Sequence, residues 1–336
     1  MAILMKLGFG TLMTFALVLL TSVFLGMFSV DYSIMALALA MVSGGFFLRV
    51  FLDWNKLNQV LEESEIKLEF EDVLNFIAVV GGAFVAFSLS IELGISAVLA
   101  SGITGVLATL ILPRFDVPIF CGSFVGMASY SLLPGYQYLG LAAVIAGGVF
   151  VLGKAAFNGF GGKLGTIAFI GCVIAAILTG QSFSGEPVIQ GELLEFLLIY
   201  SVIGAVVTFT LSERLDNSAV ISSGAVGVMA AVILPILYPE FGNTLAVMTY
   251  CASFAGMSSL KRIKDEFMMA FAGIICAIVF AFSAPYLGGA GGKLGTTAFI
   301  SVITVNGVGV AYKYFKHALI DTVRKRKTPQ KQQQLD

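Results

Sequence analysis

The hexapeptide Gly161-Gly162-Lys163-Leu164-Gly165-Thr166 recurs unchanged 130 residues later as Gly291-Gly292-Lys293-Leu294-Gly295-Thr296. In both places the sequence Ala-Phe-Ile follows after one intervening residue. A long motif repeated at a fixed offset indicates that one structural unit occurs twice in the chain. The two copies of this motif therefore decide how the rest of the chain is divided.

Two further pairs of segments extend the repeat. Cys121–Ser129 matches Cys251–Ser259 at the same offset of 130, and Ser101–Gly105 matches Ser223–Gly227 at an offset of 122. The second copy therefore carries extra residues near 236–250. The resulting organisation is an N-terminal helix pair at 1–52, a polar interfacial linker at 53–72, repeat 1 at 73–181, repeat 2 at 182–313 and a basic tail at 314–336.

The composition predicts the environment of these repeats. Of 336 residues, 58% are hydrophobic and only 12% are charged, and the net charge is −1. Soluble domains contain about a quarter charged residues. This excludes a soluble enzyme, a disordered chain and a nucleic-acid-binding protein. Because the apolar stretches do not alternate with polar residues as barrel strands do, the sequence predicts an all-α, polytopic integral membrane protein.

About twelve apolar segments can be marked, and each repeat contains five of them. They lie at 7–29, 32–51, 73–91, 95–112, 119–133, 136–153, 164–180, 192–211, 218–237, 243–260, 266–284 and 294–312. The first is too long for the core of a signal peptide. The polar stretch 53–72, with apolar residues at near-helical spacing, is expected to form a surface helix at the cytoplasmic interface.

Lysine and arginine predict the orientation, since they concentrate on the cytoplasmic side. If all twelve segments cross the inner (plasma) membrane with both termini in the cytoplasm, every basic residue except Lys293 falls on the cytoplasmic side. Five crossings per copy would make the repeats inverted. The alternative is that the segments 119–133 and 243–260 are re-entrant and do not cross the membrane. Each copy would then cross four times, and the two copies would be parallel. We favour inversion, because it places more of the basic residues on the cytoplasmic side.

The repeated hexapeptide is the first candidate site. Its glycines allow positive φ and precede a long apolar helix, so each lysine is expected at a helix N-terminus, which favours an anion. A nucleotide-binding P-loop is excluded by the spacing. The alternative is that each lysine reaches a membrane interface and the glycines form a turn. The candidate residues are Gly161, Gly162, Lys163, Thr166, Gly291, Gly292, Lys293 and Thr296.

The second candidate site is the repeated Ser-Phe-x-Gly-Met-x-Ser sequence. Its small residues are suited to close helix packing, which is the simpler interpretation. The functional interpretation is a broken helix that lines a pore, in which Phe124 and Phe254 form a constriction. The remaining candidate lining residues are Ser123, Gly126, Ser129, Ser253, Gly256 and Ser259.

The chain offers no expected metal site, cofactor site or enzyme chemistry. The four cysteines form no CxxC pair, the single histidine is His317, and no Asp or Glu lies in the middle of a predicted span. The sequence therefore predicts a transporter or channel for a small molecule or ion, with an anion slightly preferred and the pathway between the repeats. A neutral-solute channel and a non-transporting membrane scaffold are the alternatives, and a homo-oligomer is compatible with the sequence. A water-accessible cavity lined by Lys163, Lys293, Ser123 and Ser253 would favour transport.

Overall fold

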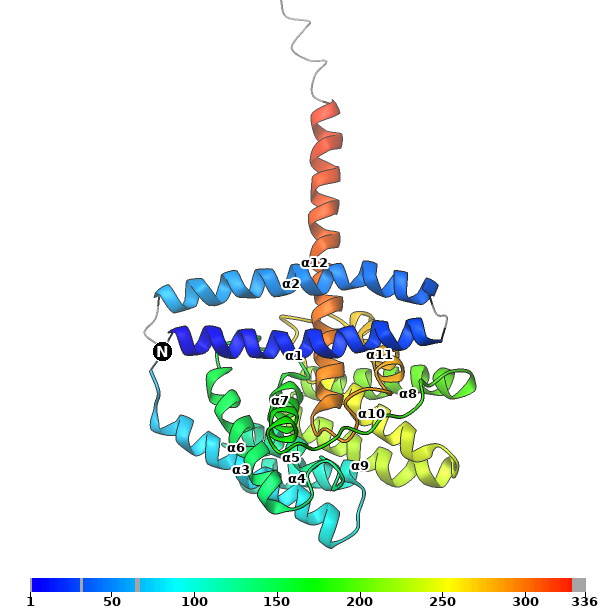
Figure 1. Ribbon diagram of the computed structural model, residues 1–336. Helices are drawn as coiled ribbons and strands as arrows, with labels where there is room; N and C mark the ends of the chain where they lie inside the picture. Colours follow the sequence, from blue (N-terminus) through cyan, green and yellow to red (C-terminus); the bar gives the residue numbers. More distant parts are fainter. Residues whose placement is uncertain (1, 31–32, 64–66, 328–336) are drawn as a thin grey trace, which may run out of the picture.

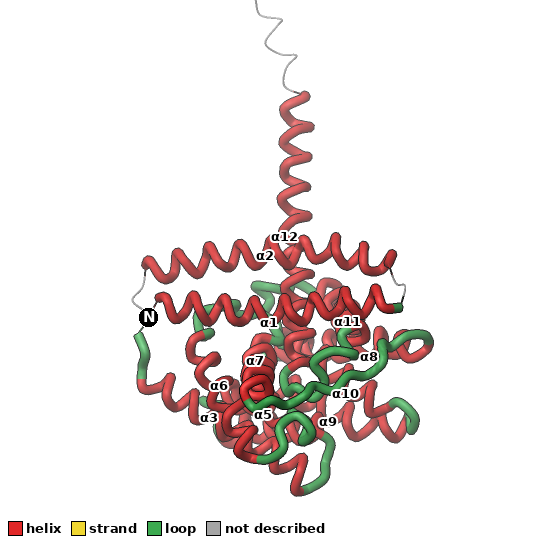
Figure 2. The backbone as a smooth tube through the Cα atoms, viewed as in Figure 1, coloured by secondary structure: helices red, strands yellow, loops and turns green. Residues whose placement is uncertain are grey.

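The computed structural model describes residues 2–30, 33–63 and 67–327. These residues form twelve α-helices and one π-helical turn, and no strand (Figures 1 and 2). The all-α prediction is confirmed. In chain order the elements are α1 (Ala2–Ser29), α2 (Ser33–Glu63), α3 (Phe70–Glu92), α4 (Ala97–Ile111), α5 (Asp116–Gly126), α6 (Tyr136–Leu152), α7 (Lys163–Leu178), α8 (Glu192–Phe209), η1 (Thr210–Arg214), α9 (Ala219–Leu237), α10 (Gly242–Gly256), α11 (Glu266–Phe282) and α12 (Lys293–Lys327).

Fewer helices have the length of a full membrane span than the twelve segments predicted. Among the described residues, α1, α3, α8 with η1, α9 and the first part of α12 are long and apolar enough to cross a membrane. Five further apolar helices, α4, α5, α6, α7 and α11, contain 10–17 residues. A span needs about 20 apolar residues. These five helices are therefore shorter than a full span.

Several element boundaries differ from the expected ones. The predicted segment 119–133 is helical only as far as Gly126, and residues 127–135 run on without regular helix to Gly135, whose φ is 121°. Residues 53–63 continue α2 without a break and do not form a separate surface helix. The tail residues 314–327 continue α12, whereas 328–336 lie outside the described residues.

Glycine contacts bring the two sequence copies together. The helices α7 and α12 cross where Gly165 meets Gly295, and a Cβ on either residue would lie 2.4 Å from the Cα of the other. The helices α4 and α9 meet in the same manner at Gly102 and Gly224, where a Cβ on either would lie 3.0 Å from the carbonyl oxygen of the other. Small residues let helix backbones approach this closely. Both contacts are reciprocal between matching positions.

The N-terminal helices α1 and α2 lie side by side along one face of the bundle, and α12 crosses them steeply (Figure 1). A Cβ on Gly26 of α1 would clash with the carbonyl of Phe282, and one on Gly307 of α12 would clash with the carbonyl of Gly45 in α2. These close backbone contacts make the N-terminal pair an integral part of the bundle. The C-terminal end of α12 extends beyond the other helices (Figure 1).

Candidate functional site

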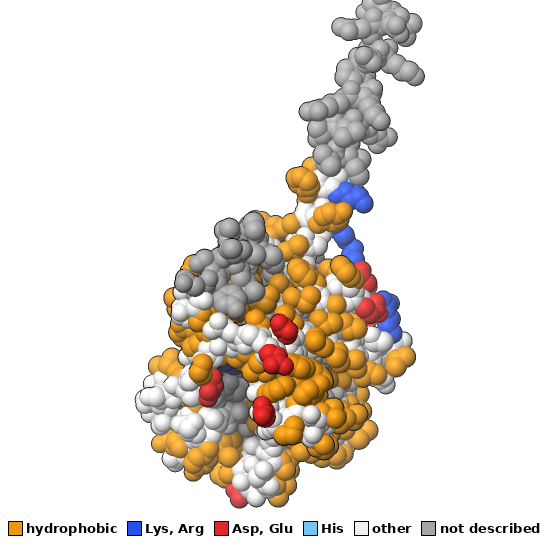
Figure 3. Space-filling view, turned by 90° about the vertical axis from the view of Figure 1, so that its right-hand side faces the viewer, with side chains coloured by type: hydrophobic (Ala, Val, Ile, Leu, Met, Phe, Trp, Pro, Cys, Tyr) orange, Lys and Arg blue, Asp and Glu red, His pale blue; other side chains and the backbone are white. Residues whose placement is uncertain are grey.

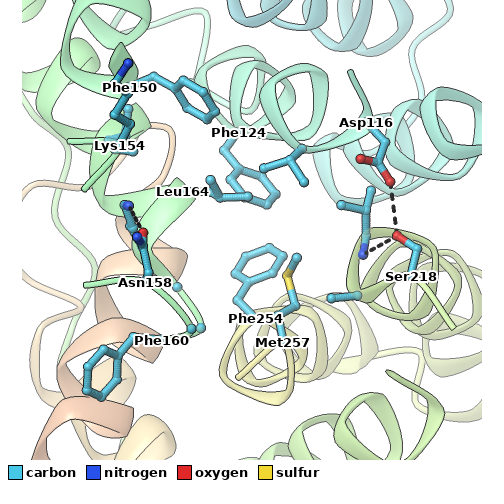
Figure 4. A pocket seen from close by; sticks show the side chains of 18 residues that line it. Asp116, Phe124, Phe150, Lys154, Asn158, Phe160, Leu164, Ser218, Phe254 and Met257 are labelled. Atoms are coloured by element: carbon cyan, nitrogen blue, oxygen red, sulfur yellow. Dashed lines mark hydrogen bonds between the residues drawn. The ribbon is translucent and has the colours of Figure 1, made fainter. Parts of the chain in front are cut away.

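A cavity of about 440 Å³ lies between parts of both sequence copies. It is lined by the start of α5, the end of α6, the turn at 158–162, the start of α7, the start of α9 and the end of α10. Its polar lining residues are Asp116, Lys154, Asn158, Lys163 and Ser218. Figure 4 labels all of these except Lys163. Most of the other lining side chains are apolar. The cavity therefore presents a few polar groups on otherwise apolar walls, which is typical of small-molecule sites.

Lys163 is held at one end of this cavity by the predicted helix start. Gly162 takes the left-handed conformation, with φ of 81°, and α7 begins at the next residue. The ammonium of Lys163 donates to Asn158 Oδ1 at 3.1 Å and forms no ion pair with any residue that the structure describes. The first amides of a helix have no intrahelical acceptor. This end of the cavity therefore combines an uncompensated cation with a helix N-terminus.

The equivalent Lys293 has different surroundings. Gly292 has φ of 83° and α12 begins at Lys293, which matches the first copy. The Lys293 ammonium, however, donates to the backbone carbonyls of Ser283 at 2.7 Å and Tyr286 at 2.5 Å, and it does not line the cavity. Two lysines of identical sequence context thus have different roles in the structure.

The remaining residues of the hexapeptides serve packing. The hydroxyls of Thr166 and Thr296 donate to the carbonyls of Gly162 and Gly292, each at 3.3 Å, and both threonines are fully buried. These hydroxyls do not line the cavity. A Cβ on Gly161 would lie 2.2 Å from the carbonyl oxygen of Phe254. Gly161 and Gly162 nevertheless contribute backbone to the cavity wall. A Cβ on the corresponding Gly291 would lie 2.3 Å from the carbonyl oxygen of Phe124.

Two of the serines predicted as pore lining, Ser123 and Ser253, are buried between helices. Ser123 donates to the carbonyl of Phe120 at 2.8 Å and contacts the hydroxyl of Ser101, also at 2.8 Å. Ser253 forms the matching contacts with the carbonyl of Tyr250 at 2.7 Å and the hydroxyl of Ser223 at 2.8 Å. Both Ser123 and Ser253 have no exposed surface. Of the four residues expected to line a transport cavity, the observed cavity therefore contains Lys163 but not Lys293, Ser123 or Ser253.

Other members of the second motif also hold helices and turns together. A Cβ on Gly126 would lie 2.6 Å from the carbonyl oxygen of Ala83 in α3, and one on Gly256 would lie 2.5 Å from that of Ala205 in α8. The backbone amide of Ser129 donates to the carbonyl of Gly289 at 2.9 Å, and that of Ser259 donates to the carbonyl of Gly159 at 3.0 Å. These contacts fix the turn before each hexapeptide against the opposite copy.

Phe124 and Phe254 are the members of this motif that reach the cavity. Their ring centroids lie 4.5 Å apart, and each residue is only 1% exposed. Both line the cavity between its two polar ends (Figure 4). The two rings are in contact and form part of the cavity wall, and their role as a constriction stays a prediction.

Four polar residues of the cavity were not predicted from the sequence, namely Asp116, Lys154, Asn158 and Ser218, and Asp116 is the one acidic residue among them. It is 8% exposed, and its Oδ2 accepts hydrogen bonds from Ser218 at 3.0 Å and Thr109 at 3.2 Å. Its Oδ1 has no hydrogen-bond partner among the described residues, and no cation of the described chain pairs with it. Asp116 lies outside the predicted apolar segment, so hydropathy alone did not draw attention to it. Pro118, which suits the first turn of a helix, was the available signal that a helix begins here.

The rim of the cavity is stabilised by ion pairs. Lys154 pairs with Asp72 at 2.7 Å, so its charge is compensated. Arg262 donates to the carbonyl of Asn158 at 2.9 Å, pairs with Asp53 at 3.1 Å and lies over the ring of Phe160, 4.2 Å from its centroid. Burial lowers the pKa of Arg262, and the neighbouring Asp53 acts in the opposite direction. These contacts hold the turn that carries Asn158 in place.

Comparison of the chain with protein-family models, with curated proteins and with solved structures finds no match. Across the part of the chain that the structure describes, no group of three or more His, Cys, Asp or Glu residues is arranged to hold a metal ion.

Proposed function

We propose that this protein is an integral membrane transporter for a small solute, and that the solute carries an anionic group that binds at Lys163. The observation that supports this proposal is a cavity of about 440 Å³ with a lysine at a helix N-terminus and no acidic partner for it among the described residues. Lys163 is half-buried, and a cation that loses part of its hydration without gaining a counterion is unfavourable. An anionic ligand would compensate that charge.

The surface of the described helices supports the membrane assignment. Large apolar side chains such as Phe267, Phe70 and Ile236 are 74–85% exposed. The space-filling view shows hydrophobic side chains over much of one face, with charged residues confined to small groups (Figure 3). Extended apolar surface of this kind is unfavourable in water and favourable in lipid. The inner membrane, with both termini in the cytoplasm, is the location that the basic residues favour.

The contacts between the copies support an inverted-repeat architecture. The reciprocal glycine contacts relate matching positions of the two copies. The ion pairs Lys154–Asp72, Arg114–Glu71 and Arg262–Asp53 join segments that inversion assigns to the cytoplasmic side. Tyr136 and Glu92, whose hydrogen bond measures 2.9 Å, join two segments assigned to the outside. Short helices continued by non-helical segments are also characteristic of inverted-repeat transporters.

Cysteine labelling distinguishes inverted from parallel copies. In a cysteine-free background, we expect Glu240→Cys to react with an impermeant maleimide from outside, whereas Lys261→Cys reacts only after permeabilisation. Both positions are exposed. Parallel copies place both positions in the cytoplasm and place Arg214 outside. External labelling at position 214, with none at 240, would contradict inversion.

Uptake into proteoliposomes tests the anion site. The probes are acetate, chloride and inorganic phosphate, with urea and glycerol as neutral solutes. A charge-assisted hydrogen bond contributes roughly 1.5–3 kcal/mol, so Lys163→Met should reduce transport of the preferred anion about ten-fold or more. The matched control is Lys261→Met, which removes an exposed lysine and should change nothing.

The results separate the alternatives. If the protein transports urea or glycerol, and Lys163→Met leaves that transport unchanged, the result would favour a neutral-solute channel. An absence of uptake for every probe in the wild-type protein would favour a non-transporting scaffold. The contact between Phe124 and Phe254 supports a gated pathway in preference to a permanently open pore.

A further inference from the structure

We propose that the solute is a zwitterion, with a carboxylate that binds at Lys163 and an ammonium group that binds at Asp116, joined by an apolar chain. This inference rests on the proposed function, because it concerns the same cavity. It goes further in assigning a second charged group to the solute and a binding role to Asp116.

The charges in the cavity carry the inference. Of the three charged residues that line it, Lys154 is neutralised by Asp72 at 2.7 Å. Lys163 has only Asn158 as a polar partner, and Asp116 has only the hydroxyls of Ser218 and Thr109. One cation and one anion therefore remain without counterions among the described residues. Asp116 is buried, at 8% exposed, and Lys163 is half-buried. Charges withdrawn from water are normally paired or bound to a ligand, and a zwitterion would compensate both at once.

The separation of the two charges determines the kind of zwitterion. In Figure 4, Asn158 and Lys154 lie on one side of the cavity and Asp116 and Ser218 on the other. The start of α7 touches α5 where the Cys121 thiol meets the carbonyl of Leu164, at 3.3 Å. Five residues of helix, about 7.5 Å, separate Cys121 from Asp116. A ligand that reaches both sides of the cavity therefore needs its charges several bonds apart.

The walls between the charged ends suit an apolar chain. Phe124, Leu164, Phe254 and Met257 lie between them (Figure 4). The cavity volume of about 440 Å³ lies within the roughly 300–1,000 Å³ typical of small-molecule pockets, so it is large enough for a short linear molecule. A simple anion such as acetate would leave both the apolar walls and Asp116 without contacts.

Three probes with one carbon skeleton test the inference. These are 6-aminohexanoate, hexanoate and hexylammonium, titrated calorimetrically against the full-length protein in detergent at neutral pH. We expect 6-aminohexanoate to bind at least ten-fold more tightly than either singly charged probe. Asp116→Asn should remove this advantage over hexanoate, and Asp116→Glu should retain it. Lys163→Met should weaken the binding of both carboxylates.

Control variants and folding checks accompany the titrations. Glu240→Gln and Lys261→Met change exposed residues of the same types and should bind 6-aminohexanoate like the wild type. The asparagine oxygen can still accept the Ser218 hydrogen bond, so Asp116→Asn should unfold at a temperature close to that of the wild type. If Asp116→Asn unfolds at a lower temperature than the wild type, the Asp116→Glu variant and the comparison of the three probes on the wild-type protein still test whether a zwitterion is preferred.

The outcomes separate this inference from the proposed function. If hexanoate binds as tightly as 6-aminohexanoate, and Asp116→Asn changes neither, the zwitterion is wrong and the anion transporter stands. If no probe binds while anion uptake persists and depends on Lys163, the zwitterion is also wrong. If anion uptake is absent as well, both proposals fall.

Discussion

Replacing Gly165 with alanine places a methyl carbon 2.4 Å from the Cα of Gly295. Carbon atoms in contact normally lie about 3.5–4.0 Å apart, so α7 and α12 must separate by more than about 1 Å. Since the obstacle is backbone, no side-chain rotation relieves it. Overpacking of this kind costs about 1–3 kcal/mol.

Gly81→Ala is the matched control. Gly81 lies in α3, and a Cβ there would meet nothing within 4 Å. Alanine is favoured over glycine in a helix by roughly 0.5–1 kcal/mol, a gain available to both variants. The difference between them therefore isolates the overpacking. We expect Gly165→Ala to be less stable than Gly81→Ala by about 1–3 kcal/mol, measured by denaturant unfolding of the purified protein in micelles.

Reciprocity gives a second test of the same contact. Gly295→Ala should cost as much as Gly165→Ala, because its Cβ would lie 2.4 Å from the Cα of Gly165. A single separation of the helices relieves much of both clashes, so the double variant should cost less than the sum of the two single variants. Equal stability of Gly165→Ala and Gly81→Ala would show that these helices do not cross at these glycines.

Two further substitutions test buried polar contacts. Arg49 and Arg262 pair with Asp53 at 2.7 and 3.1 Å. Asp53→Asn removes the acidic partner of both arginines and should destabilise the protein by about 3–5 kcal/mol, measured by thermal unfolding. An effect below about 1 kcal/mol would mean that the two arginines are solvated. Tyr250→Phe removes the 2.9 Å hydrogen bond to Ser101 and should cost only about 0.5–1.5 kcal/mol, because the ring remains packed; a larger loss of stability would contradict this assignment.

The sequence predicted the helix starts of the hexapeptides correctly. The glycines at 162 and 292 take positive φ, and α7 and α12 begin at Lys163 and Lys293. This prediction succeeded because it depends on local chemistry, in which glycine permits a conformation that other residues disfavour.

The number of full membrane spans was less predictable from the sequence. An apolar stretch such as 119–133 has the same composition whether it forms a helix or crosses the bundle as buried non-helical chain.

The set of residues that line the cavity could not be predicted from the sequence, for a different reason. Asp116, Lys163, Ser218 and Phe254 belong to four separate elements, and only the packing of those elements brings them together. Small polar residues gave no help, because Ser123 has the same sequence features as a pore-lining serine and is nevertheless buried between helices. Duplication identified residues that matter to the fold, whereas the charge at Asp116 occurs in only one copy.

The difference between Lys163 and Lys293 follows from the segment that joins the two copies. Residues 181–191 run beside the turn before the second hexapeptide, where Ser184 and Gly288 exchange two backbone hydrogen bonds of 2.9 and 3.2 Å and Glu186 donates to the carbonyl of Ala284 at 3.2 Å. That turn directs its carbonyls onto Lys293. At the first turn Asn158 supplies a single side-chain oxygen to Lys163, so its ammonium keeps the capacity to bind a ligand. One duplicated motif thus yields a structural lysine in one copy and a candidate binding lysine in the other.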